Sequence, residues 1–184
     1  MDPSASSNFA AARIEMGPGA ELVIGARVTT ERTPGALTLL LGAGARVEIG
    51  DGTWLRTELE PIHISVFDGA RVVLGPDSWL NGCHLSAKHA IVGGRRTWIG
   101  PGCRVIDSDQ HALDDTHREQ GGPITIGDHV WITSDVTVLR GVRIGSHAVI
   151  GARSLVNRDV PDHTLAFGQP ATARGTVGDR SQAP

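Results

Sequence analysis

Aliphatic residues recur every six positions through the C-terminal half of the chain. One register runs through Ile126, Ile132, Val138, Ile144, Ile150 and Val156. A second register begins four residues after the first and contains Val130, Val136, Val142, Ala148, Ser154 and Val160. A period of six fits neither the 3.6 residues of a helical turn nor the two-residue alternation of a plain strand. It predicts a coil in which each unit forms one short strand and one bend, with the aliphatic side chain pointing inward.

The pattern is weaker upstream. Leu74, Leu80, Ser86 and Val92 share one register, and an extra residue shifts it to Ile99 and Val105. The segments "IGARVT" from Ile24 and "IGDGTW" from Ile49 are isolated units. A single unit buries too little to fold alone, so the units must stack into a continuous core. With three units per turn, the chain is long enough for roughly seven or eight turns stacked about 4.8 Å apart.

The repeat stops between Ile106 and Gly122, and "GGPITIG" restores it. An irregular loop of this length inside a compact repeat protein is usually functional or disordered. Asp107, Asp109 and His111 stand within five residues at its start, which favours a functional loop. An imidazole with an unperturbed pKa of about 6.5 is the side chain best suited to accept a proton near neutral pH.

The six-residue period, together with "IGxxVWI" and "IGAxSxV", resembles the hexapeptide-repeat acyltransferases. The resemblance covers about Leu74 to Pro170. It implies an all-β fold, a left-handed parallel β-helix, with an excursion loop over about 106–123. We expect a single β-helix domain over 13–174, and flexible, aperiodic segments at 1–12 and 175–184.

The segment "DSDQHALDDTHREQGGPITIGDHVWI" resembles the sugar and small-molecule O-acetyltransferase branch of this family. The resemblance implies that His111 is the general base that takes a proton from an acceptor hydroxyl as its oxygen attacks acetyl-CoA. Such base catalysis contributes roughly 10²–10⁴ in rate. Asp107 or Asp109 would orient the ring or bind the acceptor, and the sequence does not distinguish the two.

Three further positions match the family's site residues. Trp131, in the "VWI" step, would lie beside the acceptor or the pantetheine arm. Ser134 falls where a backbone N–H meets the thioester carbonyl, as an oxyanion requires. Asn81, in "WLNGC", resembles an asparagine that contacts acceptors. The sequence departs from the family at Thr133, where glycine is usual.

The C-terminal "SHAVIGARSLVNRDVPDHTLAFGQPATARG" resembles the family's last coils, where coenzyme A lies in a groove between subunits. Gly151 and Ala152 would allow a close approach of the pantetheine arm. Arg153 replaces a usual glycine, and Thr172 replaces a usual basic residue. The phosphate contact would therefore come from Arg158 or Arg174. Because family members share their sites between chains, the resemblance also implies a homotrimer.

Charge and composition limit the classes of binding partner that we expect. The net charge is −3 and no basic block is present, which argues against nucleic acid and anionic membranes as partners. No apolar run approaches 18 residues, and the N-terminus lacks the basic and apolar regions of a signal peptide, so we expect a cytoplasmic protein. Cys83 and Cys103 form no disulfide scaffold and no zinc spacing.

Other functions remain open. An amino-sugar acceptor would make the enzyme an N-acetyltransferase. A zinc hydratase of the γ-carbonic-anhydrase type needs three histidines, and the sequence offers only His84, His89 and, upstream, His63. A non-catalytic β-helix scaffold is a third class. No metal is expected. The acceptor is not identified, although Trp54 and Trp79 are candidates for specificity.

Overall fold

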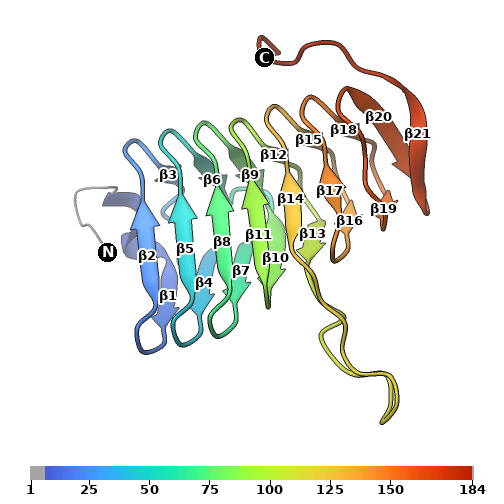
Figure 1. Cartoon of the computed structure of the whole chain (residues 1–184). Coiled ribbons are helices and arrows are strands. Elements are labelled where there is room, and N and C mark those ends of the chain that lie inside the picture. Colours follow the sequence, from blue (N-terminus) through green and yellow to red (C-terminus); the bar gives the residue numbers. More distant parts are fainter. Residues whose placement is uncertain (1–6, 184) are drawn as a thin grey trace.

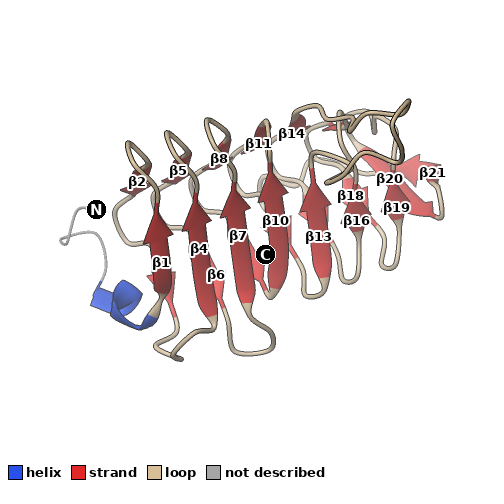
Figure 2. Ribbon diagram, turned by 90° about the horizontal axis from the view of Figure 1, so that it is seen from below, coloured by secondary structure: helices blue, strands red, loops and turns tan. Residues whose placement is uncertain are grey.

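The computed structural model describes residues 7–183, which wind into a parallel β-helix with three flat faces (Figures 1 and 2). Each face is a sheet whose neighbouring strands are parallel, except for the antiparallel pair β20 and β21 at the C-terminal end. Successive strands of the chain pass from sheet A to sheet B to sheet C, and then begin the next coil. The all-β fold class predicted from the six-residue period is confirmed.

The strands are short, as the six-residue unit requires. Sheet A contains seven strands, β1 (Arg13–Met16), β4 (Leu37–Leu41), β7 (Ile62–Val66), β10 (Cys83–Ala87), β13 (Cys103–Ile106), β16 (Thr137–Val138) and β19 (Leu155–Val156). Sheet B contains six strands, β2 (Glu21–Ile24), β5 (Arg46–Ile49), β8 (Arg71–Leu74), β11 (Ala90–Gly93), β14 (Ile124–Ile126) and β17 (Arg143–Ile144). Sheet C contains eight strands, β3 (Thr29–Thr30), β6 (Trp54–Arg56), β9 (Trp79–Asn81), β12 (Trp98–Ile99), β15 (Trp131–Ile132), β18 (Val149–Ile150), β20 (Thr164–Gly168) and β21 (Ala171–Thr176).

The core is a set of aliphatic columns parallel to the axis of the coil. On sheet C the inward column contains, in consecutive coils, Leu55, Leu80, Ile99, Ile132 and Ile150, all of them buried. Both registers of the regular repeat, from Ile126 to Val160, are buried as the period predicts. Each buried aliphatic side chain stabilises the coil by about 1.5–3 kcal/mol relative to an exposed one.

The upstream register predicted through Ser86 and Val92 is wrong. Leu85, rather than Ser86, pairs with Val105, and Gly93, rather than Val92, pairs with Leu74. The step from Leu80 to Leu85 is five residues and the step from Leu85 to Gly93 is eight, so the inward position falls first one residue early and then one residue late, and this net shift of one continues to Ile99. Ser86 is nevertheless buried, because the loop that follows β13 covers it with Gln110.

The N-terminal coils are as regular as the C-terminal ones. Ile24 and Ile49 occupy one inward column with Leu74, although the sequence shows them as isolated units. A 3-10 helix, η1 (Ser7–Ala11), lies at this end and buries Phe9 against the core. At the other end, residues 177–183 lie against sheet C, whereas the aperiodic sequence predicts an unattached tail.

Three histidines stack at successive corners between sheets B and C. The ring centroids are 5.0 Å apart for His129 and His147, and 4.6 Å apart for His147 and His163. All three have φ between 55° and 59°, the left-handed conformation that usually favours glycine or asparagine. The tail is bound to this column, because the Arg180 N–H donates to His147 Nδ1 at 3.0 Å.

Candidate functional site

The loop predicted from the break in the repeat leaves the prism at the corner between sheets A and B. Strand β13 ends at Ile106 and β14 begins at Ile124, and the segment between them projects away from the coils (Figure 1). An antiparallel bridge between Ser108 and Gly121 closes its stem. Residues 111–118 form the tip, and all of them are exposed. His111 is therefore the first residue beyond the stem.

Asp107 is buried inside the stem and is fully occupied by backbone contacts. Its Oδ1 accepts the N–H of Lys88 at 2.7 Å and its Oδ2 accepts the N–H of His89 at 2.8 Å. Other corner aspartates bind the neighbouring coil in a similar way, such as Asp51 with the N–H of Ala26. The two bonds give Asp107 a structural role in holding the loop to the preceding coil, and the structure shows no contact between it and His111.

Asp109 anchors the stem to the following coil. Its Oδ1 accepts a hydrogen bond from Arg140 Nε at 2.7 Å, and its Oδ2 accepts the N–H of Gln120 at 3.2 Å. The hydrogen bond from Arg140 is the main cause that lowers the pKa of Asp109 below its ordinary value.

The His111 ring makes no hydrogen bond with any residue between 7 and 183. Its surroundings within the chain are the exposed tip and the Glu119 carboxylate, whose pKa is lowered in part by the charge of His111. Nearby, His117 pairs with Asp114 at 2.9 Å and closes the tip of the loop. The imidazole of His111 is therefore free to meet a group outside its own chain.

A cavity of about 420 Å³ lies on sheet C, and it brings together three of the predicted site residues, Asn81, Trp131 and Ser134. Its other lining residues are mostly apolar, and they are Trp79, Trp98, Ile99, Gly100, Pro101, Thr133, Arg180 and Ala183. His111 is not among them. In a three-sided prism the corner between sheets A and B lies opposite sheet C, so one chain holds the loop and the cavity on opposite sides.

Four tryptophans form one wall of this region. Trp54, Trp79, Trp98 and Trp131 occupy the same outward position in four consecutive coils of sheet C. The Trp54 and Trp79 rings are stacked with centroids 5.4 Å apart, and the Trp98 ring meets Trp79 edge-on at 6.0 Å. Trp131 is 42% exposed. The pairing of strands in successive coils aligns them, although they are 25, 19 and 33 residues apart in the sequence.

The C-terminal tail supplies the opposite wall. The Arg180 guanidinium lies 5.7 Å from the Trp98 centroid and 5.4 Å from the Trp131 centroid. Arg96 holds the tail in place by donating to the backbone carbonyls of Ser181 at 2.6 Å and Ala183 at 2.8 Å. Sequence reasoning missed Arg180 because its segment has no repeat, and nothing in the sequence indicates where such a tail will lie.

The cavity presents polar groups that have no partner within the described chain. Trp79 Nε1 and Asn81 Oδ1 are buried and unpaired. At the corner between sheets C and A, the N–H groups of Thr133 and Asp135 bind neighbouring coils, whereas that of Ser134 donates to no residue between 7 and 183. Unpaired polar groups are rare in protein interiors and need a partner. The Ser134 N–H is thus a donor without a partner at the edge of the cavity.

The predicted coenzyme residues divide between two corners. Gly151 and Ala152 follow β18 at the same corner as Ser134, one coil further along. Arg174 lies on β21 with its guanidinium 5.5 Å from the Phe167 ring, and Phe167 in turn borders Gly151. Arg158 follows β19 at the corner between sheets A and B and is exposed. Of the two candidates for the phosphate contact, only Arg174 lies near Gly151, because both border the Phe167 side chain.

The two sequence departures also differ in position. Arg153 projects into solvent with its side chain 83% exposed, and its Nε is 3.9 Å from Asp135 Oδ2. Thr172 pairs with Phe167 in the antiparallel hairpin. Neither side chain lines the cavity on sheet C.

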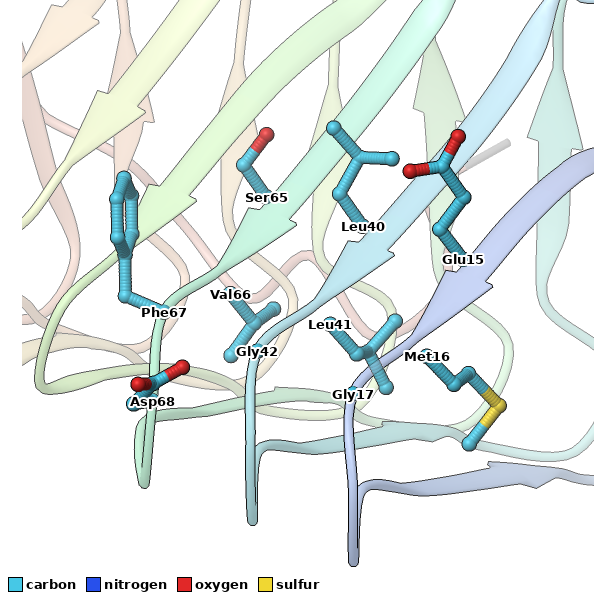
Figure 3. Close-up of a pocket in the computed structure, with 10 residues that line it drawn as sticks. All are labelled: Glu15, Met16, Gly17, Leu40, Leu41, Gly42, Ser65, Val66, Phe67 and Asp68. Atoms are coloured by element: carbon cyan, nitrogen blue, oxygen red, sulfur yellow. The ribbon is translucent and has the colours of Figure 1, made fainter.

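A second cavity, of about 440 Å³, lies at the N-terminal end of sheet A (Figure 3). The ends of β1, β4 and β7 line it, with the exposed side chains of Met16 and Phe67 at its sides. None of the predicted site residues lies in it.

Residues 7–183 contain no group of three histidine, cysteine, aspartate or glutamate side chains that could hold a metal ion. His84 faces outward on sheet A with its ring centroid 6.3 Å from that of His63, whereas His89 lies at the next corner beside Gly121. Over the same residues, no helix is long and apolar enough to cross a membrane.

Comparison with known proteins agrees with this architecture. Residues 123–158 match the family model described as bacterial transferase hexapeptide (six repeats). A galactoside O-acetyltransferase of Lactococcus lactis subsp. lactis (strain IL1403) is 38% identical over 93 residues, which are 48% of this chain and 44% of the relative. The chain thus spans less than half the length of this curated relative.

Solved structures extend the similarity to most of the chain. A galactoside acetyltransferase in complex with coenzyme A superposes with a TM-score of 0.62 and 28% identity, covering 73% of this chain and 67% of that one. The polySia-specific acetyltransferase NeuO, at 22% identity, shows the same fold with a TM-score of 0.69, covering 95% of this chain and 91% of that one. From the repeat, the three-sided coil and these relatives, we conclude that residues 123–158 carry the repeats of the bacterial transferase hexapeptide family, and that the chain has the left-handed parallel β-helix fold of these solved acetyltransferases.

Proposed function

We propose that the protein transfers an acetyl group from acetyl-CoA to a hydroxyl of a sugar or small metabolite. The observation that carries the proposal is the cavity on sheet C, in which Trp131 and Asn81 lie beside the unpaired N–H of Ser134. Gly151 and Ala152 continue the same corner toward Arg174, so a long, narrow cosubstrate can follow the edge of the prism. The relative that binds coenzyme A has the same fold.

In this proposal His111 is the general base. One ring nitrogen takes the proton of the acceptor hydroxyl while the oxygen attacks the carbonyl carbon of the thioester. The negative charge that develops on the carbonyl oxygen is stabilised by the Ser134 N–H, which has no other partner in the described chain. When the carbonyl re-forms, the C–S bond breaks, and the proton held by His111 passes to the departing thiolate. The products are the acetyl ester and free coenzyme A.

We infer that a second copy of the chain completes the site. His111 lies at the corner opposite sheet C, so its own chain cannot place it beside Trp131 and Ser134. We propose a homotrimer in which the loop of each chain reaches the cavity of the next, since a head-to-tail interface closes into a ring. Each ring of three then contains three equivalent sites.

We also propose a cytoplasmic location. Cys83 and Cys103 are neighbours across adjacent strands, and both are free and buried. Burial raises the pKa of the Cys103 thiol to about 11, and the Cys83 thiol is raised by the same cause. Two neighbouring cysteines without a disulfide between them are typical of proteins from a reducing compartment.

The experiment combines cosubstrate binding with an acceptor screen. Calorimetry with acetyl-CoA tests binding without knowledge of the acceptor, and we expect a micromolar Kd and one site per chain. A screen for release of free coenzyme A then compares hydroxyl and amino sugars, using the wild type and His111→Ala. Because the base contributes roughly 10²–10⁴, we expect His111→Ala to lose at least a hundredfold in kcat and to keep its Kd for acetyl-CoA. No binding at millimolar acetyl-CoA would contradict the proposal.

A further inference from the structure

The side chain of Lys88 crosses from the corner between β10 and β11 to both arms of the loop. Its Nζ donates to the carbonyl oxygen of Gln110 at 2.8 Å, and it contacts the two carboxylate oxygens of Glu119 at 2.8 and 3.0 Å. The ammonium also lies 5.1 Å from the Phe67 ring centroid. It is the only lysine in the sequence. One partly buried cation thus joins the residue before His111 to the returning arm of the loop.

The backbone at this point is strained. Gln110 has a φ of 69°, in the left-handed region that costs a residue with a side chain about 1–2 kcal/mol. Its N–H and its side-chain amide both donate to the Ser108 hydroxyl, at 3.3 and 2.7 Å, while Lys88 binds its carbonyl. The contacts on both sides of Gln110 hold it in this conformation. Strain that persists next to a candidate catalytic residue indicates that the direction of the chain matters there.

The nearby carboxylates differ in what they can do for His111. Asp107 is occupied by two backbone N–H groups, and Asp109 is paired with Arg140. Glu119 is bound by the same ammonium that binds the carbonyl of Gln110, the residue before His111, so its charge lies close enough to act on the His111 ring. The hydrogen bond from Lys88 lowers the pKa of Glu119 below its ordinary value, so the carboxylate is ionised at neutral pH.

We propose that Lys88 and Glu119 are positioning residues for His111. Lys88 fixes the strained backbone from which the histidine projects, and it also ties the Glu119 carboxylate to that backbone. Glu119 then stabilises, through its charge, the imidazolium that forms when His111 takes the acceptor's proton. This proposal rests on the proposed function and replaces Asp107 and Asp109 as the residues that orient the base.

The test compares Lys88→Met, Lys88→Arg, Glu119→Gln and Arg118→Met in the full-length protein. Arg118 is the matched control, because it is a cation of the same loop whose side chain contacts neither arm of the stem. For Lys88→Met we expect kcat to fall about 10–100-fold, since a small misplacement of a catalytic group can cost 10²-fold. We expect the Kd for acetyl-CoA to stay within twofold, because that site lies on sheet C. Lys88→Arg should keep most of the activity that Lys88→Met loses. Glu119→Gln should lower kcat and leave the Kd for acetyl-CoA unchanged. Arg118→Met should match the wild type in both quantities.

A second readout does not depend on activity. Trypsin cleaves after arginine, and the bond after Arg118 lies in the exposed loop. Mass spectrometry of the fragments should show faster cleavage at this bond in Lys88→Met, with unchanged cleavage after the other arginines, because the loop opens locally. If the wild type neither binds nor uses acetyl-CoA, the proposed function fails, and the cleavage rates still decide whether Lys88 clamps the loop. Unchanged cleavage in Lys88→Met, or a kcat within twofold of the wild type, would overturn the proposal.

Discussion

Replacing Asp107 by alanine should destabilise the fold strongly, although the sequence alone places this residue among the catalytic candidates. The carboxylate is 0% exposed and accepts the N–H groups of Lys88 and His89 at 2.7 and 2.8 Å. A hydrogen bond to a charged group contributes about 1.5–3 kcal/mol, and alanine leaves two partly buried donors without a partner. We therefore expect the free energy of unfolding to fall by about 3 kcal/mol or more.

Urea unfolding followed by tryptophan fluorescence measures this change, with all variants at one protein concentration because assembly adds to stability. With a slope of about 2 kcal/mol/M, a loss of 3 kcal/mol moves the midpoint down by about 1.5 M. Asp109→Ala is the control, since its ion pair with Arg140 lies at the surface and surface pairs contribute little. Asp107→Asn, which keeps one acceptor oxygen, should fall between the two. If Asp107→Ala and Asp109→Ala unfold at the same urea concentration, the structural role assigned to Asp107 is wrong.

Two further predictions concern the corner histidines and the tail. Burial, together with the positive charges of His147 and Arg96, lowers the pKa of His129, while Asp128 and Asp179 act in the opposite direction. The unfolded chain therefore takes up a proton near pH 6.5 that the folded chain does not, so the wild type should lose stability as pH falls below about 6.5 toward the lower pKa of the folded state. Asn fits the left-handed corner, so in thermal melts His129→Asn should lose less between pH 7.5 and 5.5, and equal losses would contradict the assignment. For Arg180→Ala, which removes the cation above Trp98 and Trp131, we expect the Kd for acetyl-CoA to rise about five- to tenfold, or about 1–1.4 kcal/mol. A calorimetric Kd equal to or below that of the wild type would show that the tail is not a wall of the site.

The six-residue period predicted the coil because it reflects burial directly, and the inward positions from Ile126 to Val160 follow it without exception. The prediction failed where units are not six residues long, as around Leu85 and Gly93, because a five-residue unit and then an eight-residue unit shift the register by one residue without an obvious signal. A signal for Asp107 was available. It follows the inward-facing Val105 by two residues, and the alternation of a strand places it inside.

The remaining parts of the candidate site depend on contacts that no local pattern encodes. Lys88 and Glu119 are 31 residues apart, and Arg96 meets Ser181 across 85 residues. These long-range contacts form only when the coils are stacked and the loop and the tail are packed against them. The sequence predicted the loop with its histidine and three residues of the cavity. The contact of Lys88 with Glu119, and the position of Arg180 beside the cavity, could be found only in the structure.

The central claim is that the loop of one chain completes the cavity of another, and mixing two inactive variants tests it most directly. His111→Ala keeps an intact cavity, and Trp131→Ala keeps an intact loop. The two proteins are unfolded together, refolded and assayed for release of coenzyme A from acetyl-CoA with the best acceptor. In random assemblies about one interface in four joins an intact loop to an intact cavity. The account predicts that the mixture regains up to about a quarter of wild-type activity, and a mixture no more active than the two variants measured separately would contradict it.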